Sequence, residues 1–197
     1  VIKISRQAGD AIMEVYQTDF EIQLKNDLSP VTKADKRANT IIENGLKDLD
    51  HTIPILSEEG RNIAYKERKD WESFWLVDPL DGTKDFIKKN GEFTVNIALV
   101  ESNTPVFGVV YAPATDKLFW GSIENGAWKK RGHNQAQTMK VACQIDGTVQ
   151  IAASRSHPSD KMNLFLSQFN RYELHAIGSS LKICLVSDGS VHLYPRL

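Results

Sequence analysis

The chain has 197 residues, of which 41% are hydrophobic, so it can bury the core of one domain or of two small ones. Its 24 basic and 25 acidic residues give a net charge of -1, which argues against bulk electrostatic binding to nucleic acid or to a membrane surface, although not against a local basic pocket. The two cysteines lie far apart in the sequence, no apolar run approaches the ~18–20 residues that cross a bilayer, and no signal-peptide pattern is visible, so we expect a reducing, cytoplasmic setting.

The first part of the chain is predicted to begin with two helices and to continue as strands. Apolar residues recur at helical spacing over residues 2–17 and 33–49, which predicts two amphipathic helices. Asn125-Gly126 favours a tight hairpin turn, and the basic run Lys129-Lys130-Arg131 is interpreted as the solvated end of that hairpin. The predicted strands of this part cover residues 55–56, 74–78, 93–100, 105–112 and 117–123.

From residue 145 on, strands and helices alternate. Strands are expected at 149–153 and 173–177, and helices at 158–169 and 179–187. This alternation is typical of a small α/β unit behind an α+β one. We therefore predict a layered α+β and α/β fold, with a first domain over residues 1–144 and a second domain over 145–197.

One segment carries most of the chemical information: Asp78-Pro79-Leu80-Asp81-Gly82-Thr83, at the end of the apolar run 74–77. Two carboxylates that project from a strand end favour a hard cation such as Mg²⁺, because its preferred ligands are oxygens. The Gly82-Thr83 pair adds backbone N–H groups and a hydroxyl, which are the donors that a bound phosphate needs. The segment therefore predicts metal-assisted phosphate chemistry.

A site with two metals needs more carboxylates than this segment supplies. Glu58 and Glu59 follow the preceding predicted strand and are the obvious further donors, with Glu59 expected to support the site and not to bind metal. Asp35 lies at the start of the second helix, where it can point into the same site or form a helix capping box with Thr32. Both roles are open, and they can coexist.

Together these motifs resemble the inositol monophosphatase superfamily of Mg²⁺-dependent, lithium-sensitive phosphatases. The resemblance rests on Ser57-Glu58-Glu59, on the 78–83 segment and on Asn90-Gly91-Glu92-Phe93-Thr94-Val95-Asn96-Ile97-Ala98, and it extends over the whole chain. Residues 82–87 and 178–184 are most similar to the family's bacterial 3′(2′),5′-bisphosphate nucleotidases. The resemblance implies an αβαβα sandwich whose second domain is truncated here. It also implies an enzyme of sulfate assimilation that converts adenosine 3′,5′-bisphosphate to AMP, in the cytoplasm or peripherally on the cytoplasmic face of the bacterial inner membrane.

The resemblance also implies roles for individual residues. Two or three Mg²⁺ ions are expected, with Li⁺ as an inhibitor, and the implied metal ligands are Glu58, Asp78, Asp81 and the backbone carbonyl of Leu80. The scissile phosphate is expected on the backbone of Gly82 and Thr83, and Glu58, Leu80 and Asp81 also border it. The residues implied in activating the attacking water are Asp35, Glu58 and Thr83.

Substrate choice is expected to depend on the C-terminal part. Gly178-Ser179-Ser180 precedes a predicted helix with Lys182 in its first turn, and a helix N-terminus with a lysine is a reasonable anion site. Arg196 stands where inositol-specific relatives carry an acidic residue, and its guanidinium can bind a second phosphate in a bidentate manner. The expected partner is therefore a small phosphorylated nucleotide and not a nucleic acid. The implied nucleotide contacts are Ser156, His157, Ser179, Lys182 and Arg196.

Other interpretations stay open. An inositol monophosphatase is the alternative substrate assignment. A phosphatase with an aspartyl-phosphate intermediate would favour Asp-x-Asp spacing, and a calcium-binding loop would need acidic groups where Pro79 and Leu80 stand. A relative that only binds a nucleotide is harder to dismiss. Family members continue into a Trp-Asp-x-Ala-Ala-Gly segment whose aspartate binds metal, whereas this sequence ends at Leu197, so we expect it to be a fragment.

Overall fold

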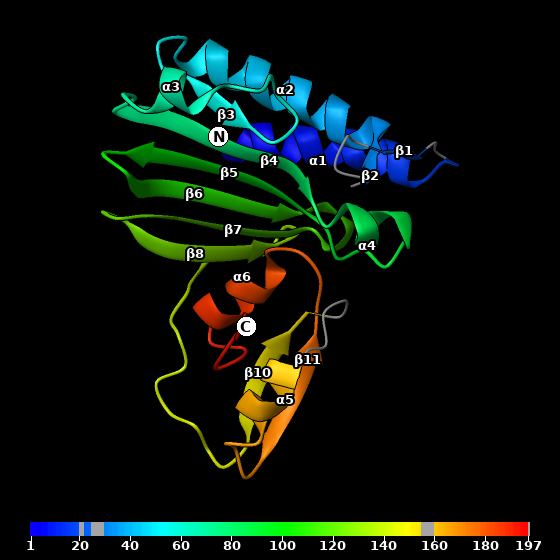
Figure 1. Cartoon of the computed structure of the whole chain (residues 1–197), viewed down its shortest axis with the longest axis vertical. Helices are drawn as coiled ribbons and strands as arrows, with labels where there is room; N and C mark the ends of the chain where they lie inside the picture. The colour runs from blue at the N-terminus through cyan, green and yellow to red at the C-terminus, as the bar shows by residue number, and fades with distance from the viewer. Residues whose placement is uncertain (20–21, 25–29, 155–159, 197) are drawn as a thin grey trace.

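The computed structural model describes residues 1–19, 22–24, 30–154 and 160–196. Its centre is a seven-stranded mixed sheet in the order β3-β4-β5-β6-β7-β8-β9 (Figure 1). β3 and β4 pair in parallel, and every following pair of neighbours is antiparallel. The strands are β3 (Ile55–Ser57), β4 (Ser73–Asp81), β5 (Thr94–Glu101), β6 (Thr104–Ala112), β7 (Lys117–Ser122), β8 (Gly126–Arg131) and β9 (Gln137–Thr138).

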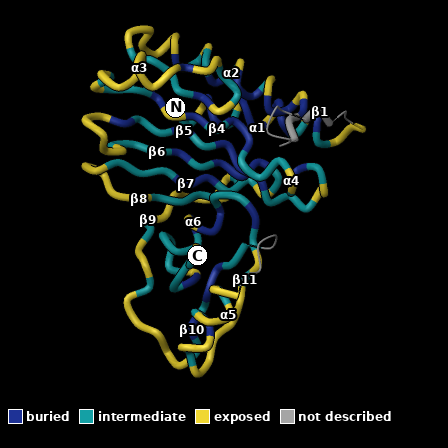
Figure 2. Tube along the Cα trace, viewed as in Figure 1, coloured by how far each residue is buried: buried dark blue, intermediate teal, exposed yellow. Residues whose placement is uncertain are grey.

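Two long helices cover one face of this sheet. α1 (Ile2–Tyr16) and α2 (Lys33–Leu49) lie side by side, and each buries a stripe of small and branched apolar residues, as their sequence periodicity predicts. The main core lies between these helices and the sheet, where Figure 2 shows many buried residues in dark blue. A small antiparallel ribbon, β1 (Ile22–Leu24) and β2 (Pro30–Thr32), leads into α2.

The other face of the sheet meets the C-terminal part of the chain. Leu181 and Cys184 of α6 (Leu181–Ser187) pack against Ala112 of β6 and Phe119 of β7. β10 (Val149–Ala153) and β11 (Tyr172–Ala176) form a parallel pair, which α5 (Asp160–Leu166) covers through Leu166. Figure 1 therefore shows the layers α1/α2, sheet, α6, β10–β11 and α5, in agreement with the predicted layered fold.

Most predicted elements are confirmed, with ends that agree or differ by one to three residues. The helix expected at 158–169 is described only as Asp160–Leu166, since residues 158 and 159 lie outside the described part. Sequence reasoning missed the ribbon β1–β2, the short helices α3 (Tyr65–Arg68) and α4 (Thr83–Ile87), and the two-residue strand β9. Segments this short carry too few residues for a periodic pattern. The division of the chain at residue 144 stays a prediction.

The interpretation of the basic run 129–131 as solvated is corrected at one residue. Arg131 is exposed, but the Lys129 ammonium donates a 2.8 Å hydrogen bond to Asp188, just after α6. The ion pair joins β8 to the C-terminal part of the chain.

Among the described residues, no helix has both the length and the apolar character that crossing a membrane requires.

Candidate active site

A bulge near the end of β4 turns the two motif aspartates to one side of the sheet. Asp78 pairs with Asn96 of β5 and Asp81 pairs with Thr94, so β4 carries one residue more than β5 between these pairs. In a regular strand, residues three apart face opposite sides, but an extra residue shifts this alternation by one. Pro79 lies within the bulge, where its missing N–H costs no ladder hydrogen bond. Asp78 and Asp81 consequently line the same cleft.

Gly82 and Thr83 mark the turn from β4 into α4. Gly82 has a φ of +91°, and a Cβ atom on it would lie 2.9 Å from the carbonyl oxygen of Glu92, so glycine is required on both counts. Its carbonyl oxygen accepts hydrogen bonds from the N–H groups of Asp85 at 2.8 Å and Phe86 at 2.9 Å, which begins α4. Gly82 and Thr83 themselves border the cleft, so their backbone approaches any phosphate bound there.

The Asp35 carboxylate forms the expected helix cap and also contacts Thr83 of the cleft wall, although it does not itself line the cleft and its role in catalysis stays a prediction. Oδ2 accepts hydrogen bonds from the Thr32 N–H and hydroxyl, each at 2.7 Å, and the capping box at the start of α2 is thereby confirmed. Oδ1 accepts a hydrogen bond from the Thr83 hydroxyl at 3.3 Å, and that hydroxyl lies equally far from the Leu80 carbonyl oxygen. The side chain is almost fully buried, so the cap holds it rigidly beside the cleft.

The carboxylates of the cleft repel one another. Burial, together with the neighbouring charges of Asp81, Glu58 and Asp35, raises the pKa of Asp78 to about 8. Burial also raises the pKa of Asp81, although the Ser180 N–H and the Lys182 ammonium counteract this. A cation between these groups would relieve both the burial cost and the repulsion. The electrostatics therefore suit a site for a positive ion.

The oxygen atoms that line the cleft suit the way in which Mg²⁺ is usually bound at phosphate sites. Within the described ranges, no group of three or more histidine, cysteine, aspartate or glutamate side chains is arranged so that it could hold a metal ion. Mg²⁺, however, is commonly bound through one or two carboxylates, while waters and phosphate oxygens complete its octahedron. Asp78, Asp81 and Leu80 line the cleft with Glu58, whose side chain is exposed there, and they meet this smaller requirement. Glu59 does not line the cleft, and the supporting role expected for it stays a prediction.

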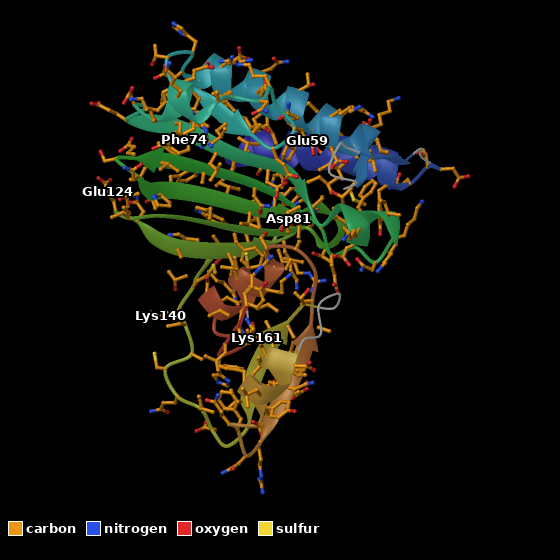
Figure 3. The ribbon with its side chains drawn as sticks, viewed as in Figure 1. Glu59, Phe74, Asp81, Glu124, Lys140 and Lys161 are labelled. Carbon is orange, nitrogen blue, oxygen red and sulfur yellow. The ribbon has the colours of Figure 1, made fainter. Side chains whose placement is uncertain are left out.

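The opposite wall of the cleft is a loop that precedes α6. The cleft has a volume of about 470 Å³, and in Figure 3 Asp81 lies where the sheet meets the C-terminal part of the chain. The Gly178 N–H donates a 2.7 Å hydrogen bond to the Glu92 carboxylate. The Ser180 hydroxyl donates to the Asn96 side chain at 2.8 Å and lies 2.8 Å from the Thr94 hydroxyl. Three polar contacts thus fix this loop to the edge of the cleft that carries Asp81.

The predicted nucleotide contacts are brought together only in part. Ser179, Lys182 and Arg196 line the same cleft. The Lys182 ammonium donates to the carbonyl oxygens of Ser179 at 2.6 Å and Ile177 at 3.2 Å, so it braces the loop and retains one of its three N–H donors for a ligand. Ser156 and His157 lie outside the described residues. The substrate contacts of all five residues stay predictions.

Three polar residues near the site escaped sequence reasoning. Glu92 and Asn96 hold the loop before α6, and Asn39 of α2 contacts the end of β3 through Ser57. Asn39 carried a readable signal, because it is a polar residue on the buried face of an amphipathic helix. For Glu92 and Asn96, no local pattern indicates the partner, which lies more than eighty residues further on.

Comparison with known proteins identifies the family. The sequence profile of the inositol monophosphatase family matches residues 1–197, and the chain therefore belongs to that family. The 3′(2′),5′-bisphosphate nucleotidase CysQ of Salmonella typhimurium strain LT2 is 47% identical over 200 residues, which cover 100% of this chain and 78% of the relative. The crystal structure of CysQ from Bacteroides thetaiotaomicron, a bacterial member of the same family, is similar with a TM-score of 0.85 at 38% identity and covers 99% of this chain and 77% of that one.

A more distant structure shares the fold. It is an IMPase/NADP phosphatase complexed with Mg²⁺ and phosphate, similar with a TM-score of 0.76 at 19% identity over 94% of this chain and 68% of that one. At this identity the likeness concerns the fold alone. The layered α/β architecture predicted from the sequence is thus that of inositol monophosphatase family structures.

Proposed function

We propose that this chain is the main part of a Mg²⁺-dependent phosphatase that hydrolyses the 3′-phosphate of adenosine 3′,5′-bisphosphate to AMP and inorganic phosphate. The observation that carries the proposal is a single cleft with Asp78 and Asp81 beside the Gly82-Thr83 turn, and with Lys182 and Arg196 also on its wall. Acidic groups suit a metal, and basic groups suit a substrate that has a second phosphate. The Salmonella relative, which is named a 3′(2′),5′-bisphosphate nucleotidase, supports this choice of substrate.

The residues of the chain have separate tasks in this proposal. Asp78, Asp81, Glu58 and the Leu80 carbonyl would hold Mg²⁺, and the number of ions, two or three, stays a prediction. Bound Mg²⁺ would lower the pKa of water and neutralise charge on the phosphoryl oxygens. The backbone N–H groups of Gly82 and Thr83 would orient the phosphate for in-line attack, which needs no covalent enzyme intermediate.

Thr83 and Asp35 would orient the attacking water. The Thr83 hydroxyl donates its proton toward Asp35, so its own lone pairs remain able to accept a hydrogen bond from a water in the cleft. Asp35 cannot turn away, because its other oxygen is held by Thr32. The water would therefore be held with a lone pair directed at the phosphorus, and its proton would be directed toward the Thr83–Asp35 pair.

Arg196 is the residue on which the choice between nucleotide and inositol phosphate depends. Its side chain is exposed on the cleft wall, where a guanidinium can bind a second phosphate through two parallel hydrogen bonds. Inositol 1-phosphate has no second phosphate, and its hydroxyls would leave this charge unpaired. The inositol monophosphatase alternative retains the support of the family match and is tested in the same assay.

The deciding experiment measures phosphate release from adenosine 3′,5′-bisphosphate and from inositol 1-phosphate, with the full-length protein. We expect the nucleotide to turn over faster, Mg²⁺ to be required and Li⁺ to inhibit. Arg196→Gln should raise KM for the nucleotide while leaving turnover of inositol 1-phosphate unchanged. Faster turnover of inositol phosphate would overturn the substrate assignment, and undiminished activity of Asp78→Asn would overturn the mechanism.

The cellular site is a separate part of the proposal. We expect the enzyme in the cytoplasm, with peripheral association at the inner face of the bacterial inner membrane. Fractionation of cells, followed by a high-salt wash of the membranes, tests this expectation. Protein found in the soluble fraction alone at low salt would contradict the membrane association and leave the catalytic proposal intact.

A further inference from the structure

We propose that Asn39 is a positioning residue for Glu58, through a chain of hydrogen bonds that joins α2 to the end of β3. The inference rests on the proposed function, in which Glu58 acts at the cleft. It concerns how the molecule holds that side chain in place. Asn39 does not line the cleft, and its side-chain hydrogen bonds join it to Glu43 and Ser57, so we assign it a positioning role and not a catalytic one.

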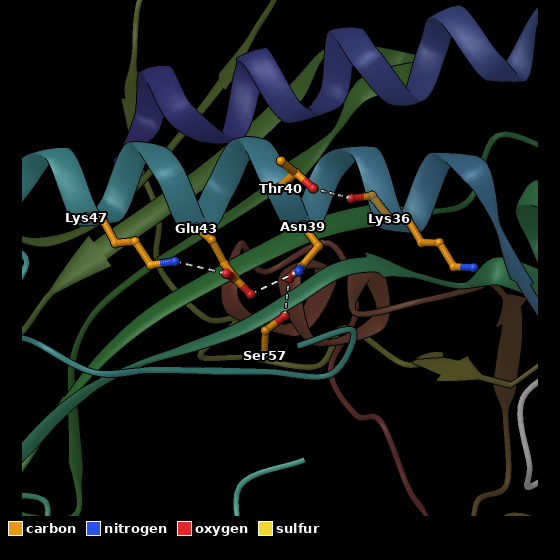
Figure 4. Close-up of polar contacts among 6 residues, drawn as sticks. All are labelled: Lys36, Asn39, Thr40, Glu43, Lys47 and Ser57. Atoms are coloured by element: carbon orange, nitrogen blue, oxygen red, sulfur yellow. Dashed lines mark hydrogen bonds and ion pairs between the residues drawn. The ribbon is translucent and has the colours of Figure 1, made fainter. Parts of the chain in front are cut away.

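The contacts form one continuous line, which Figure 4 shows. The Ser57 hydroxyl donates a 2.6 Å hydrogen bond to Oδ1 of Asn39. The Asn39 amide donates at 3.0 Å to Oε1 of Glu43, and the ammonium of Lys47 donates at 3.2 Å to the other oxygen of Glu43. Asn39 and Ser57 are both buried, with 9% of each residue exposed, so water does not readily replace their contact.

The chemistry of these groups fixes the direction of every bond. The Glu43 carboxylate only accepts, so the NH₂ group of Asn39 must face it. The carbonyl oxygen of Asn39 then faces Ser57, whose hydroxyl must donate. The amide therefore has one favourable orientation, and the Ser57 side chain is held in one rotamer.

Strand alternation connects Ser57 to the cleft. Successive side chains of an extended chain point to opposite faces. Ser57, the last residue of β3, contacts α2, and Glu58 follows it directly beyond the strand, with its side chain exposed on the cleft side. A rotation of the strand end about its axis would move both side chains together. Anchoring Ser57 on one face therefore sets the direction of Glu58 on the other.

Backbone hydrogen bonds and one side-chain hydrogen bond act together at the end of β3. β3 has three residues and is an edge strand, so it pairs only with β4. Beyond the strand, the Glu58 N–H donates to the Val77 carbonyl at 3.0 Å, and the Gly60 N–H donates to the Ser57 carbonyl at 3.2 Å. These backbone bonds fix the course of the main chain, and the Ser57–Asn39 contact adds a side-chain hydrogen bond that opposes rotation of the strand end.

The first test compares Asn39→Ala and Ser57→Ala with Thr40→Val. Thr40 is the next residue of α2, and its exposed hydroxyl bonds only to the Lys36 carbonyl of its own helix, as Figure 4 shows. We expect the first two variants to lower kcat about tenfold, with KM changed by less than about twofold, and the control to match the wild type. Ser57→Ala removes a single oxygen, so it keeps the test decisive if Asn39→Ala does not fold.

The second readout does not depend on activity. Hydrogen–deuterium exchange of peptides that span residues 55–60, measured without added metal, should be faster in Asn39→Ala and Ser57→Ala than in Thr40→Val. Unchanged exchange, or unchanged kcat in a folded Asn39→Ala variant, would overturn the inference. If the wild type released no phosphate, the proposed function would fail, while exchange would still decide whether the contact holds this segment.

A rescue experiment tests the direction of the bonds. Asn39→Asp alone places two carboxylates side by side and should lower kcat and speed exchange. Adding Glu43→Gln restores a donor amide opposite a carboxylate at the original net charge, and should recover both readouts to within about threefold of the wild type. If the double variant had the same kcat and the same exchange as Asn39→Asp, the proposed chain of hydrogen bonds would be contradicted.

Discussion

The Thr83 hydroxyl donates a hydrogen bond to Oδ1 of Asp35 across 48 residues of sequence, while Oδ2 of the same carboxylate caps α2. A helix terminus therefore fixes the orientation of a group that faces the cleft. The sequence left both a capping box and a catalytic role open to Asp35; the structure shows the cap and the contact with Thr83, and the catalytic role stays a prediction. A simple loss of activity in an Asp35 variant would therefore not separate the two roles.

Paired variants of Asp35 and Thr32 separate capping from catalysis. Asp35→Asn retains an oxygen for the cap but removes the charge beside Thr83, so we expect kcat to fall about 10²-fold or more, with about 1 kcal/mol lost from the free energy of unfolding. Thr32→Ala removes the hydroxyl that bonds to the Ala34 N–H and to Asp35, and should cost a similar free energy of unfolding with a much smaller loss of kcat. Urea unfolding and phosphate-release kinetics measure both. Equal losses of kcat in the two variants would show that Asp35 acts through the helix cap alone.

Gly82 is the most constrained backbone position of the site. Gly82→Ala meets both an unfavourable φ and the Glu92 carbonyl oxygen at 2.9 Å, whereas Gly126→Ala has a φ of +69° with nothing within 4 Å of the added methyl. We expect the control to lose about 1–2 kcal/mol of unfolding free energy from backbone strain, and Gly82→Ala to lose more and to abolish phosphatase activity. Thermal unfolding and activity assays check this. Equal stability of the two variants would mean that the loop moves away from Glu92 without cost.

The strongest sequence signals were local ones. The periodicity of α1 and α2 depends on residues within a few turns of each other, and both helices are confirmed to within one residue. The acidic segment 78–83 could be recognised as a site from its residue types alone. Its geometry could not, because Asp78 and Asp81 would face opposite sides of a regular strand, and only the pairing with β5 reveals the bulge.

Contacts between distant elements could not be predicted from one sequence. The Lys129–Asp188 ion pair spans 59 residues, and the Ser180–Asn96 hydrogen bond spans 84. Each depends on how α6 docks on the sheet, which is decided by apolar packing of Leu181 and Cys184 and not by any local pattern. The sequence alone therefore indicated that the basic run at 129–131 is the solvated end of a hairpin, although Lys129 joins β8 to the C-terminal part of the chain.

Ser180 is expected to matter for substrate binding more than for chemistry. Its hydroxyl is hydrogen-bonded to Asn96 and Thr94, and its N–H to Asp81 holds the loop against the cleft. Ser180→Ala should leave these polar groups short of a partner, at a cost of about 1–3 kcal/mol in the free energy of unfolding, and raise KM for the nucleotide. The control is Ser187→Ala, whose exposed hydroxyl bonds only to a carbonyl of its own helix. An unchanged KM in a less stable Ser180→Ala variant would remove the loop from substrate binding.

The Lys129–Asp188 pair should make stability depend on pH. Burial alone would raise the pKa of Asp188, but hydrogen bonds from Lys129 and from Ser190 outweigh it and lower the pKa below its usual value. A carboxylate whose pKa is lower in the folded state stabilises the fold above its unfolded pKa of 3.8, and this stabilisation is lost as pH falls through the folded value. Asp188 is nearly buried, with 8% of its side chain exposed, so solvent screens the pair weakly.

Asp188→Asn should therefore unfold more easily than the wild type at pH 7 and equally easily in strong acid. We expect a difference of about 1–2 kcal/mol in the free energy of unfolding at neutral pH, from the loss of charged hydrogen bonds. The difference should narrow as pH falls below the unfolded pKa, as measured by urea unfolding from pH 7 downward. Asp146→Asn removes the same charge at an exposed position and should show little difference at any pH. If the gap for Asp188→Asn stayed constant or widened in acid, the ion pair would not be what joins β8 to the C-terminal part.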